Sequence, residues 1–180
     1  MRDFFGGLLR PRVEALGLEI GTSNLKLVEL SGNPPILRGL AIRPTPPGAI
    51  QEGSIVEPGA LANELREMLS ELRTRKRYVV TAASNLSVIT RTLQVPKMPV
   101  KQMEEAVRWE AERYIPFPID EVVLDYSLLD GHETIPDGEQ MDVVVGAARQ
   151  ETVASLVEAL KAAGLEPLII DVKPFAGLRT

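Results

Sequence analysis

The sequence predicts an α/β fold, in which short apolar strands alternate with amphipathic helices. Three observations support this prediction. Residues 16–30 contain two runs of alternating apolar side chains around a short polar turn, which is the pattern of a β-hairpin. Residues 58–72 and 153–163 place apolar side chains at helical spacing. Residues 78–83 and 141–148 are almost entirely apolar or small, as in buried strands.

The turn and cap residues fit this order of elements. A third strand is predicted at 36–43, followed by the proline- and glycine-rich break at 44–48. Pro58 suits the first turn of the next helix. Gly164 stands where a left-handed cap is expected after the last helix. The remaining predicted strands are 85–96, 121–129 and 168–172, the last of them buried.

The block 86–168 has the order strand, helix, strand, strand, helix, strand. This is the order of a ferredoxin-like unit, a small α+β fold that implies no function by itself. Its charged first helix, predicted from Val100, stops before Pro116 and Pro118, because proline cannot continue a helix. Trp109 falls on the polar side of this helix, where a large aromatic is either covered by a neighbouring subdomain or binds a partner. Both interpretations stay open.

Composition limits the possible functions. The chain has 180 residues, a net charge of −5 and no cysteine, so a disulfide framework and a thiolate metal site are excluded. His132 is the single histidine, which argues against a histidine metal cluster. The acidic balance argues against nucleic-acid binding. No apolar run reaches membrane-spanning length and no signal peptide pattern is present, so we expect a cytoplasmic chain of one domain or two small subdomains.

The polar turn of the hairpin is a candidate phosphate-binding loop. Its backbone N–H groups and hydroxyls can face an anion, Lys26 can add a positive charge, and Glu19 suits a hydrated divalent cation. The candidate residues are Glu19, Gly21, Thr22, Ser23, Asn24 and Lys26, with Glu19 also a candidate Mg²⁺ ligand through water. Gly21 is expected to adopt a backbone conformation that other residues avoid. An ordinary β-hairpin has the same pattern, and that interpretation stays open at this point.

Two surface segments have two interpretations each. Residues 1–10 carry apolar side chains at helical spacing beside arginines, which is typical of a membrane-surface anchor or docking tail, or of a frayed terminus. The basic run 73–77 suits anionic lipid head groups or an acidic partner, or else it is a solvated helix end whose charges complement the helix dipole. In both cases we favour the second, structural interpretation.

The turn resembles the first phosphate loop of the actin-like ATPase superfamily, in which an acidic residue, any residue and Gly precede Thr or Ser, and a Lys follows. Glu19 stands where that superfamily usually has Asp. A subdomain inserted after this hairpin and its helix is the mark of FtsA and its relatives. Within that group, the run EAVRWEAERYIPFP at 105–118 resembles the PilM family of type IV pilus assembly proteins. The segments 95–99, 147–150 and 171–176 resemble it too.

The resemblance implies an actin-like, ribonuclease H-like core, subdomain 1A, interrupted by the ferredoxin-like unit as subdomain 1C. Residues 1–15 would then be a tail, 16–85 subdomain 1A, 86–168 subdomain 1C, and 169–180 the return towards a second half that this chain lacks. Full-length members bind ATP with Mg²⁺ between two halves. An incomplete ATP site and little or no ATPase activity are therefore implied here, and the longer side chain of Glu19 also disfavours hydrolysis.

The resemblance also implies a partner. PilM proteins are adaptors at the cytoplasmic face of the inner membrane, where the inserted subdomain helps to form a groove for the N-terminal tail of PilN. Other proteins of the pilus inner-membrane complex are further implied partners, and they hold the adaptor at the membrane. The candidate groove residues are Val88, Ile89, Arg91, Trp109, Arg113, Ile115, Pro116 and Phe117. The alternatives are an FtsA-like cytoskeletal or cell-division protein and a GspL-like component of type II secretion.

Overall fold

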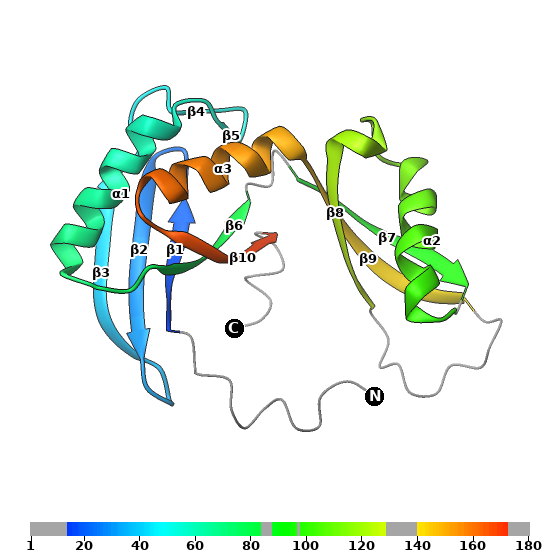
Figure 1. Cartoon of the computed structure of the whole chain (residues 1–180), viewed down its shortest axis with the longest axis horizontal. Helices are drawn as coiled ribbons and strands as arrows, with labels where there is room; N and C mark the ends of the chain where they lie inside the picture. Colours follow the sequence, from blue (N-terminus) through cyan, green and yellow to red (C-terminus); the bar gives the residue numbers. More distant parts are fainter. Residues whose placement is uncertain (1–13, 84–87, 97, 129–139, 173–180) are drawn as a thin grey trace. The chain divides into compact units, whose positions relative to one another are not determined.

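The computed structural model describes residues 14–83, 88–96, 98–128 and 140–172 (Figure 1). The expectations for the N-terminal tail, for the loop around His132 and for residues 173–180 lie outside these ranges. The chain divides into two compact units, which are described separately. The first comprises residues up to 50, 56–82 and 157–171, and the second comprises 51–55, 83–156 and residues from 172 onward.

The first unit is built on a mixed five-stranded sheet with the order β10-β6-β1-β2-β3. Its strands are β1 (Ala15–Ile20), β2 (Asn24–Ser31), β3 (Ile36–Pro44), β6 (Tyr78–Ala83) and β10 (Glu166–Val172). β1, β2 and β3 form an antiparallel meander, whereas β6 runs parallel to β1. The predicted hairpin and its third strand are confirmed.

Helix α1 (Pro58–Leu72) packs on one face of this sheet (Figure 1). Leu61, Leu65 and Met68 follow its inner side and are completely buried, as their helical spacing predicts. Gly39 of β3 permits the close approach of helix and sheet, because a Cβ there would lie 2.8 Å from Cδ2 of Leu72. The strand residues buried in this core are Leu16, Leu18, Leu25, Leu27, Ala41 and Val79.

The end of helix α3 (Gln150–Ala162) completes this layer. Ala159 and Leu160 are completely buried, and Arg66 of α1 donates a hydrogen bond from Nε to the carbonyl oxygen of Ala162 at 3.3 Å. Gly164 has a φ of 78°, which is the left-handed cap expected from the sequence.

The opposite face of the sheet is apolar and, within the described residues, exposed. Cross-strand register places Leu40, Val28, Gly17 and Val80 in one row across β3, β2, β1 and β6. Leu40 is 51% exposed, and Ile42 on the same face is similarly accessible. We call this surface the open sheet face. Within the described residues, helices therefore cover one face of this sheet, and the core lies between that face and the helices.

The second unit contains a three-stranded antiparallel sheet with the order β7-β9-β8. The strands are β7 (Val88–Pro96), β8 (Val122–Leu128) and β9 (Gln140–Arg149), and α2 (Val100–Glu112) packs against β7 and β9. Alternate strand residues face α2 and form the core with Met103 and Val107. The short β4 (Ile50–Gln51) and β5 (Ser54–Ile55) and a 3₁₀ turn at Ile119–Glu121 complete the described elements.

The structure differs from expectation at the last strand. A ferredoxin-like unit has four strands in one sheet, but β10 is an edge strand of the five-stranded sheet and leaves the second unit with three. The Glu166 N–H donates to the Arg77 carbonyl at 2.8 Å, which ties the start of β10 to the start of β6. β10 is also not buried as expected, because an edge strand has a neighbour on one side alone. Leu168 is 45% and Ile169 is 49% exposed.

Candidate functional site

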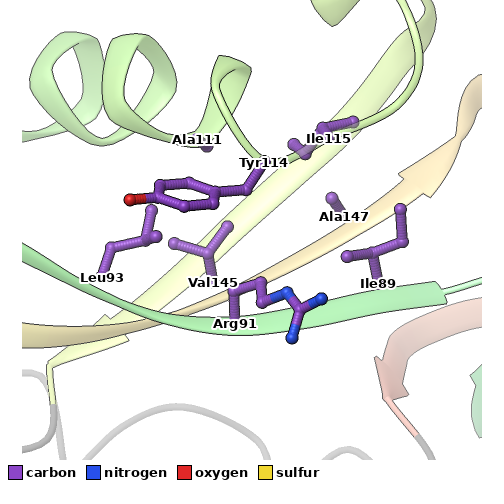
Figure 2. A pocket seen from close by; sticks show the side chains of 8 residues that line it. All are labelled: Ile89, Arg91, Leu93, Ala111, Tyr114, Ile115, Val145 and Ala147. Carbon is purple, nitrogen blue, oxygen red and sulfur yellow. The ribbon is translucent and has the colours of Figure 1, made fainter.

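A small apolar hollow lies in the second unit, between the end of α2 and the sheet (Figure 2). We call it the α2 hollow. Its volume is about 10 Å³, which is room for about one water-sized group. Its lining residues are Ile89, Arg91, Leu93, Ala111, Tyr114, Ile115, Val145 and Ala147.

The strand pleat brings the floor of this hollow together. Ile89, Arg91 and Leu93 alternate along β7, so their side chains lie on the face that α2 covers. In the register of β7 with β9, Ile89 is directly opposite Ala147 and Arg91 is opposite Val145. The sheet therefore supplies an apolar floor with one guanidinium beside it.

The end of α2 supplies the upper edge. The N–H groups of Tyr114 and Ile115 both donate to the Ala111 carbonyl, at 2.9 and 3.1 Å, which gives a tight last turn. This turn holds the half-exposed Tyr114 ring over the hollow (Figure 2). Arg91 is exposed and has no hydrogen bond or ion pair with any described residue. An apolar floor with a guanidinium beside it suits a peptide segment that offers an apolar side chain and a carbonyl or carboxylate oxygen.

The structure brings some of the expected groove residues together and leaves others apart. Ile89, Arg91 and Ile115 line the α2 hollow. Val88 alternates with Ile89 and lies on the other face of β7, opposite Ala148. Trp109 is 72% exposed and does not line the hollow. Arg113 is exposed too, and its Nη1 forms an ion pair with Glu110 at 3.1 Å on the same helix.

Side chains from β9 and from α2 hold the Ile115–Pro118 segment, which follows α2. The Arg149 guanidinium lies 4.0 Å from the centre of the Phe117 ring, which is a cation–π contact. Arg108 of α2 donates from Nη2 to the Ile119 carbonyl at 3.0 Å. Pro116 is exposed. These contacts indicate that Phe117 positions the segment that carries Ile115.

Half of the lining residues lie outside both β7 and the groove residues expected from the sequence. They are Ala111 and Tyr114 at the end of α2, and Val145 and Ala147 on β9. The alternation of Leu93 with Ile89 and Arg91 was a signal that these side chains share a face. Which β9 residues oppose them depends on long-range register, which the sequence of one strand does not specify.

In the first unit, the polar turn between β1 and β2 is closed by its own hydrogen bonds. The Gly21 N–H donates to the Asn24 carbonyl at 3.0 Å. Thr45, directly after β3, donates from Oγ1 to the Gly21 carbonyl at 2.6 Å and from its N–H to the Ser23 carbonyl at 3.0 Å. The N–H groups of Thr22 and Ser23 have no acceptor among the described residues. Two consecutive donors therefore remain for an anion.

Lys26 and Glu19 lie opposite each other across the hairpin, on the open sheet face. The Lys26 Nζ is 2.9 Å from the Glu19 Oε2. A phosphate group at the turn would meet two backbone donors, the hydroxyls of Thr22 and Ser23, and a lysine it must share with Glu19. A Mg²⁺ ion would likewise compete with Lys26 for Glu19. The described ranges contain no cluster of His, Cys, Asp or Glu that could hold a metal on its own.

Gly21→Ala is expected to destabilise the first unit by about 1–3 kcal/mol. A Cβ at Gly21 would lie 2.8 Å from the Asn24 carbonyl oxygen, a backbone atom that cannot rotate away. The requirement for glycine is therefore close approach, and not the unusual backbone dihedral expected from the sequence, because Gly21 is not among the glycines with positive φ. Gly59→Ala in α1 is the control: its Cβ meets nothing within 4 Å, and we expect a gain of about 0.5 kcal/mol. Urea unfolding measures both, and equal effects would contradict the steric explanation.

Within the described ranges, no helix is long and apolar enough to cross a bilayer. A solved structure of a PilM–PilN type IV pilus biogenesis complex contains a chain 68% identical to this one, with a TM-score of 0.91 over 94% of this chain and 50% of that chain. The cytoplasmic domain of EpsL, an inner membrane component of the type II secretion system of Vibrio cholerae, is 15% identical, with a TM-score of 0.58 over 88% of this chain and 57% of that chain.

The EpsL domain shows that the mixed α/β fold is shared beyond close relatives. This chain spans about half the length of the matched PilM–PilN chain. Residues 17–180 match the family model described as type IV pilus assembly protein PilM. Because that match covers nearly the whole sequence, the chain belongs to the PilM family of type IV pilus assembly proteins.

Proposed function

We propose that this chain is part of an adaptor of type IV pilus assembly and that it binds the N-terminal tail of PilN. The observation that supports this most strongly is the 68% identity to a chain of the PilM–PilN complex, over 94% of the sequence. The 15% identity to the EpsL domain makes a type II secretion role the weaker candidate. In this proposal the protein works at the cytoplasmic face of the inner membrane, held there by PilN and other proteins of the complex.

The α2 hollow is the proposed contact for one apolar side chain of the tail. It is too small for a leucine as it stands, so the Tyr114 ring must rotate outward to admit one. Arg91 lies beside the apolar floor and is free to donate to a carbonyl or carboxylate oxygen of the peptide. Ile89 and Ile115 would then contact the inserted side chain.

Calorimetric titration with a synthetic peptide of the PilN N-terminus tests this function. We expect Arg91→Ala to weaken binding about tenfold, which corresponds to about 1.4 kcal/mol. Arg113→Ala removes the same charge from an exposed position that does not line the hollow, and we expect a change of less than about twofold. Equal losses in both variants would indicate a general charge effect and would place the contact elsewhere.

Trp109→Ala belongs in the same titration. The indole is exposed on α2, outside the hollow, and a surface of this kind is often a binding hot spot. A loss of affinity in this variant would extend the tail-binding surface to the outer side of α2. Unchanged affinity would confine it to the hollow side.

We further propose that the β1–β2 turn is one wall of an ATP site in an actin-like fold. Thr22 and Ser23 would hold a phosphate group through their N–H groups and hydroxyls, and Lys26 would add its charge; bound Mg²⁺ would offset phosphate charge. We expect this chain alone to bind ATP weakly and to hydrolyse little, because one wall provides few contacts. Calorimetric titration with Mg–ATP measures the affinity, and a dissociation constant in the micromolar range would contradict the expected weak binding.

A further inference from the structure

A second, larger hollow lies in the first unit, where the chain leaves α1 and passes the ends of β2 and β3. It is open and has a volume of about 650 Å³. The charged residues that line it are Arg38, Arg73, Arg75, Lys76, Glu14 and Glu29. We call it the arginine hollow. Cations therefore outnumber carboxylates here, in a chain whose net charge is −5.

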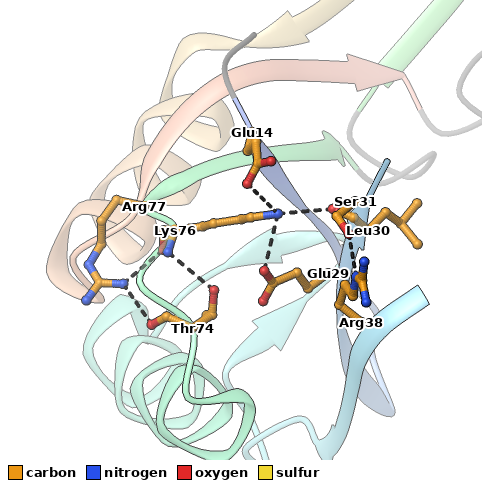
Figure 3. A network of polar contacts seen from close by, with 8 residues as sticks. All are labelled: Glu14, Glu29, Leu30, Ser31, Arg38, Thr74, Lys76 and Arg77. Carbon is orange, nitrogen blue, oxygen red and sulfur yellow. Dashed lines mark hydrogen bonds and ion pairs between the residues drawn. The ribbon is translucent and has the colours of Figure 1, made fainter. Parts of the chain in front are cut away.

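Lys76 forms ion pairs with both carboxylates of the hollow. Its Nζ lies 3.1 Å from the Glu14 Oε2 and 3.2 Å from the Glu29 Oε1, and it donates to the Leu30 carbonyl at 3.0 Å (Figure 3). The Lys76 side chain is only 12% exposed. Lys76, Glu14 and Glu29 together carry a net charge of −1, so the three arginines give the hollow a net charge of +2.

The three arginines have no carboxylate partner among the described residues. Arg38 donates from Nε to the Ser31 hydroxyl, and the exposed guanidinium groups of Arg73 and Arg75 have no hydrogen bond or ion pair with any described residue. Other arginines of the chain do have such partners: Arg43 pairs with Glu64, Arg108 with Asp120 and Arg149 with Glu151. Arg66, Arg77 and Arg91 also lack a carboxylate partner among the described residues, but none of them lines this hollow, where three such guanidiniums lie together.

Arg73 also occupies a position that suits glycine better. It ends α1 with a φ of 53°, in the left-handed region, and its N–H donates to the Ser70 carbonyl at 3.1 Å. A residue with a side chain is disfavoured there, and glycine is the usual choice. A binding role for its side chain would explain why an arginine occupies this position.

We propose that the arginine hollow binds a phosphate group, of either a free phosphorylated ligand or a lipid head group. Guanidinium groups bind phosphate through two parallel hydrogen bonds, and several of them around one hollow suit a dianion better than a single carboxylate. This site is distinct from the β1–β2 turn. Strand β2 separates the two, and its eight residues span about 25 Å.

Titration calorimetry with inorganic pyrophosphate at low salt tests the free-ligand source. We expect binding to weaken at least tenfold in Arg73→Gln/Arg75→Gln. The matched control is Lys161→Gln/Arg113→Gln, which removes two exposed cations that line neither this hollow nor the β1–β2 turn, and we expect a change of less than twofold. Arg73→Gly gives a second test, because it should raise stability to urea while it weakens pyrophosphate binding.

Sedimentation with vesicles of phosphatidylcholine containing 20% phosphatidylglycerol, about one lipid in five, tests the lipid source. Binding of the wild-type chain to these vesicles, lost in the arginine variant and kept in the control, supports the proposal even if pyrophosphate gives no heat. If neither probe binds, or if both double variants lose binding equally, the proposal is wrong. PilN peptide titration of the same variants should be unaffected, so this test is independent of the proposed function.

Discussion

Leu65→Ala is expected to lower the free energy of unfolding by about 2–5 kcal/mol. Leu65 lies on the inner side of α1 and is completely buried against the five-stranded sheet. Truncation removes the transfer free energy of its side chain and leaves a cavity that the closely packed helix and strands fill only in part. Urea unfolding monitored by circular dichroism measures the loss.

Leu40→Ala is the matched control for this change. The same atoms are removed, but Leu40 is on the open sheet face and is 51% exposed. We therefore expect a loss of less than about 1 kcal/mol, since much of the side chain contacts water already. A loss as large as that of Leu65→Ala would mean that this face is covered in solution.

Lys76→Met is expected to destabilise the first unit by about 2–3 kcal/mol at neutral pH. The change keeps the length of the side chain but removes the ammonium group that Glu14 and Glu29 share. The Glu29 side chain is only 20% exposed, so its carboxylate would be left partly desolvated without a cation. Lys161→Met, at an exposed position on α3 that has no ion pair, is the control and should change stability little.

The same network predicts a pH dependence. The hydrogen bond from Thr74, and then the hydrogen bond and charge of Lys76, lower the pKa of Glu29 below its ordinary value of 4.5. The folded state therefore binds this proton less tightly than the unfolded chain, so the stabilisation is complete above about pH 4.5 and is lost as the pH falls further. Urea midpoints measured from pH 7 down to pH 3 should fall less steeply in Lys76→Met than in the wild type. Parallel curves would contradict this assignment.

Local features of the fold could be predicted from the sequence. The β1–β2 hairpin, the buried stripe of α1, the position of Trp109 on the polar side of α2 and the cap at Gly164 all depend on patterns within a few residues. The placement of β10 could not be predicted in this way. Strand sequence does not specify which sheet accepts the strand, and the order of elements alone suggested a ferredoxin-like unit.

The candidate site was predictable only in part, for the same reason. Ile89, Arg91 and Ile115 were identified, whereas Val145 and Ala147 depend on the register of β7 with β9. At the β1–β2 turn, the sequence indicated the need for glycine at position 21 but not its cause. The contact with the Asn24 carbonyl arises from how tightly the turn closes, which is visible only in three dimensions.

The ion pair between Glu19 and Lys26 also affects how the protein behaves at high concentration. It lies on the open sheet face, two residues along each strand from the apolar pair Gly17 and Val28. A charged pair within an accessible apolar surface limits the size of the uninterrupted patch and opposes stacking of one sheet on another. Neutralising it should therefore lower solubility before it alters the fold, and we expect Lys26 to oppose aggregation in addition to its proposed role in binding phosphate.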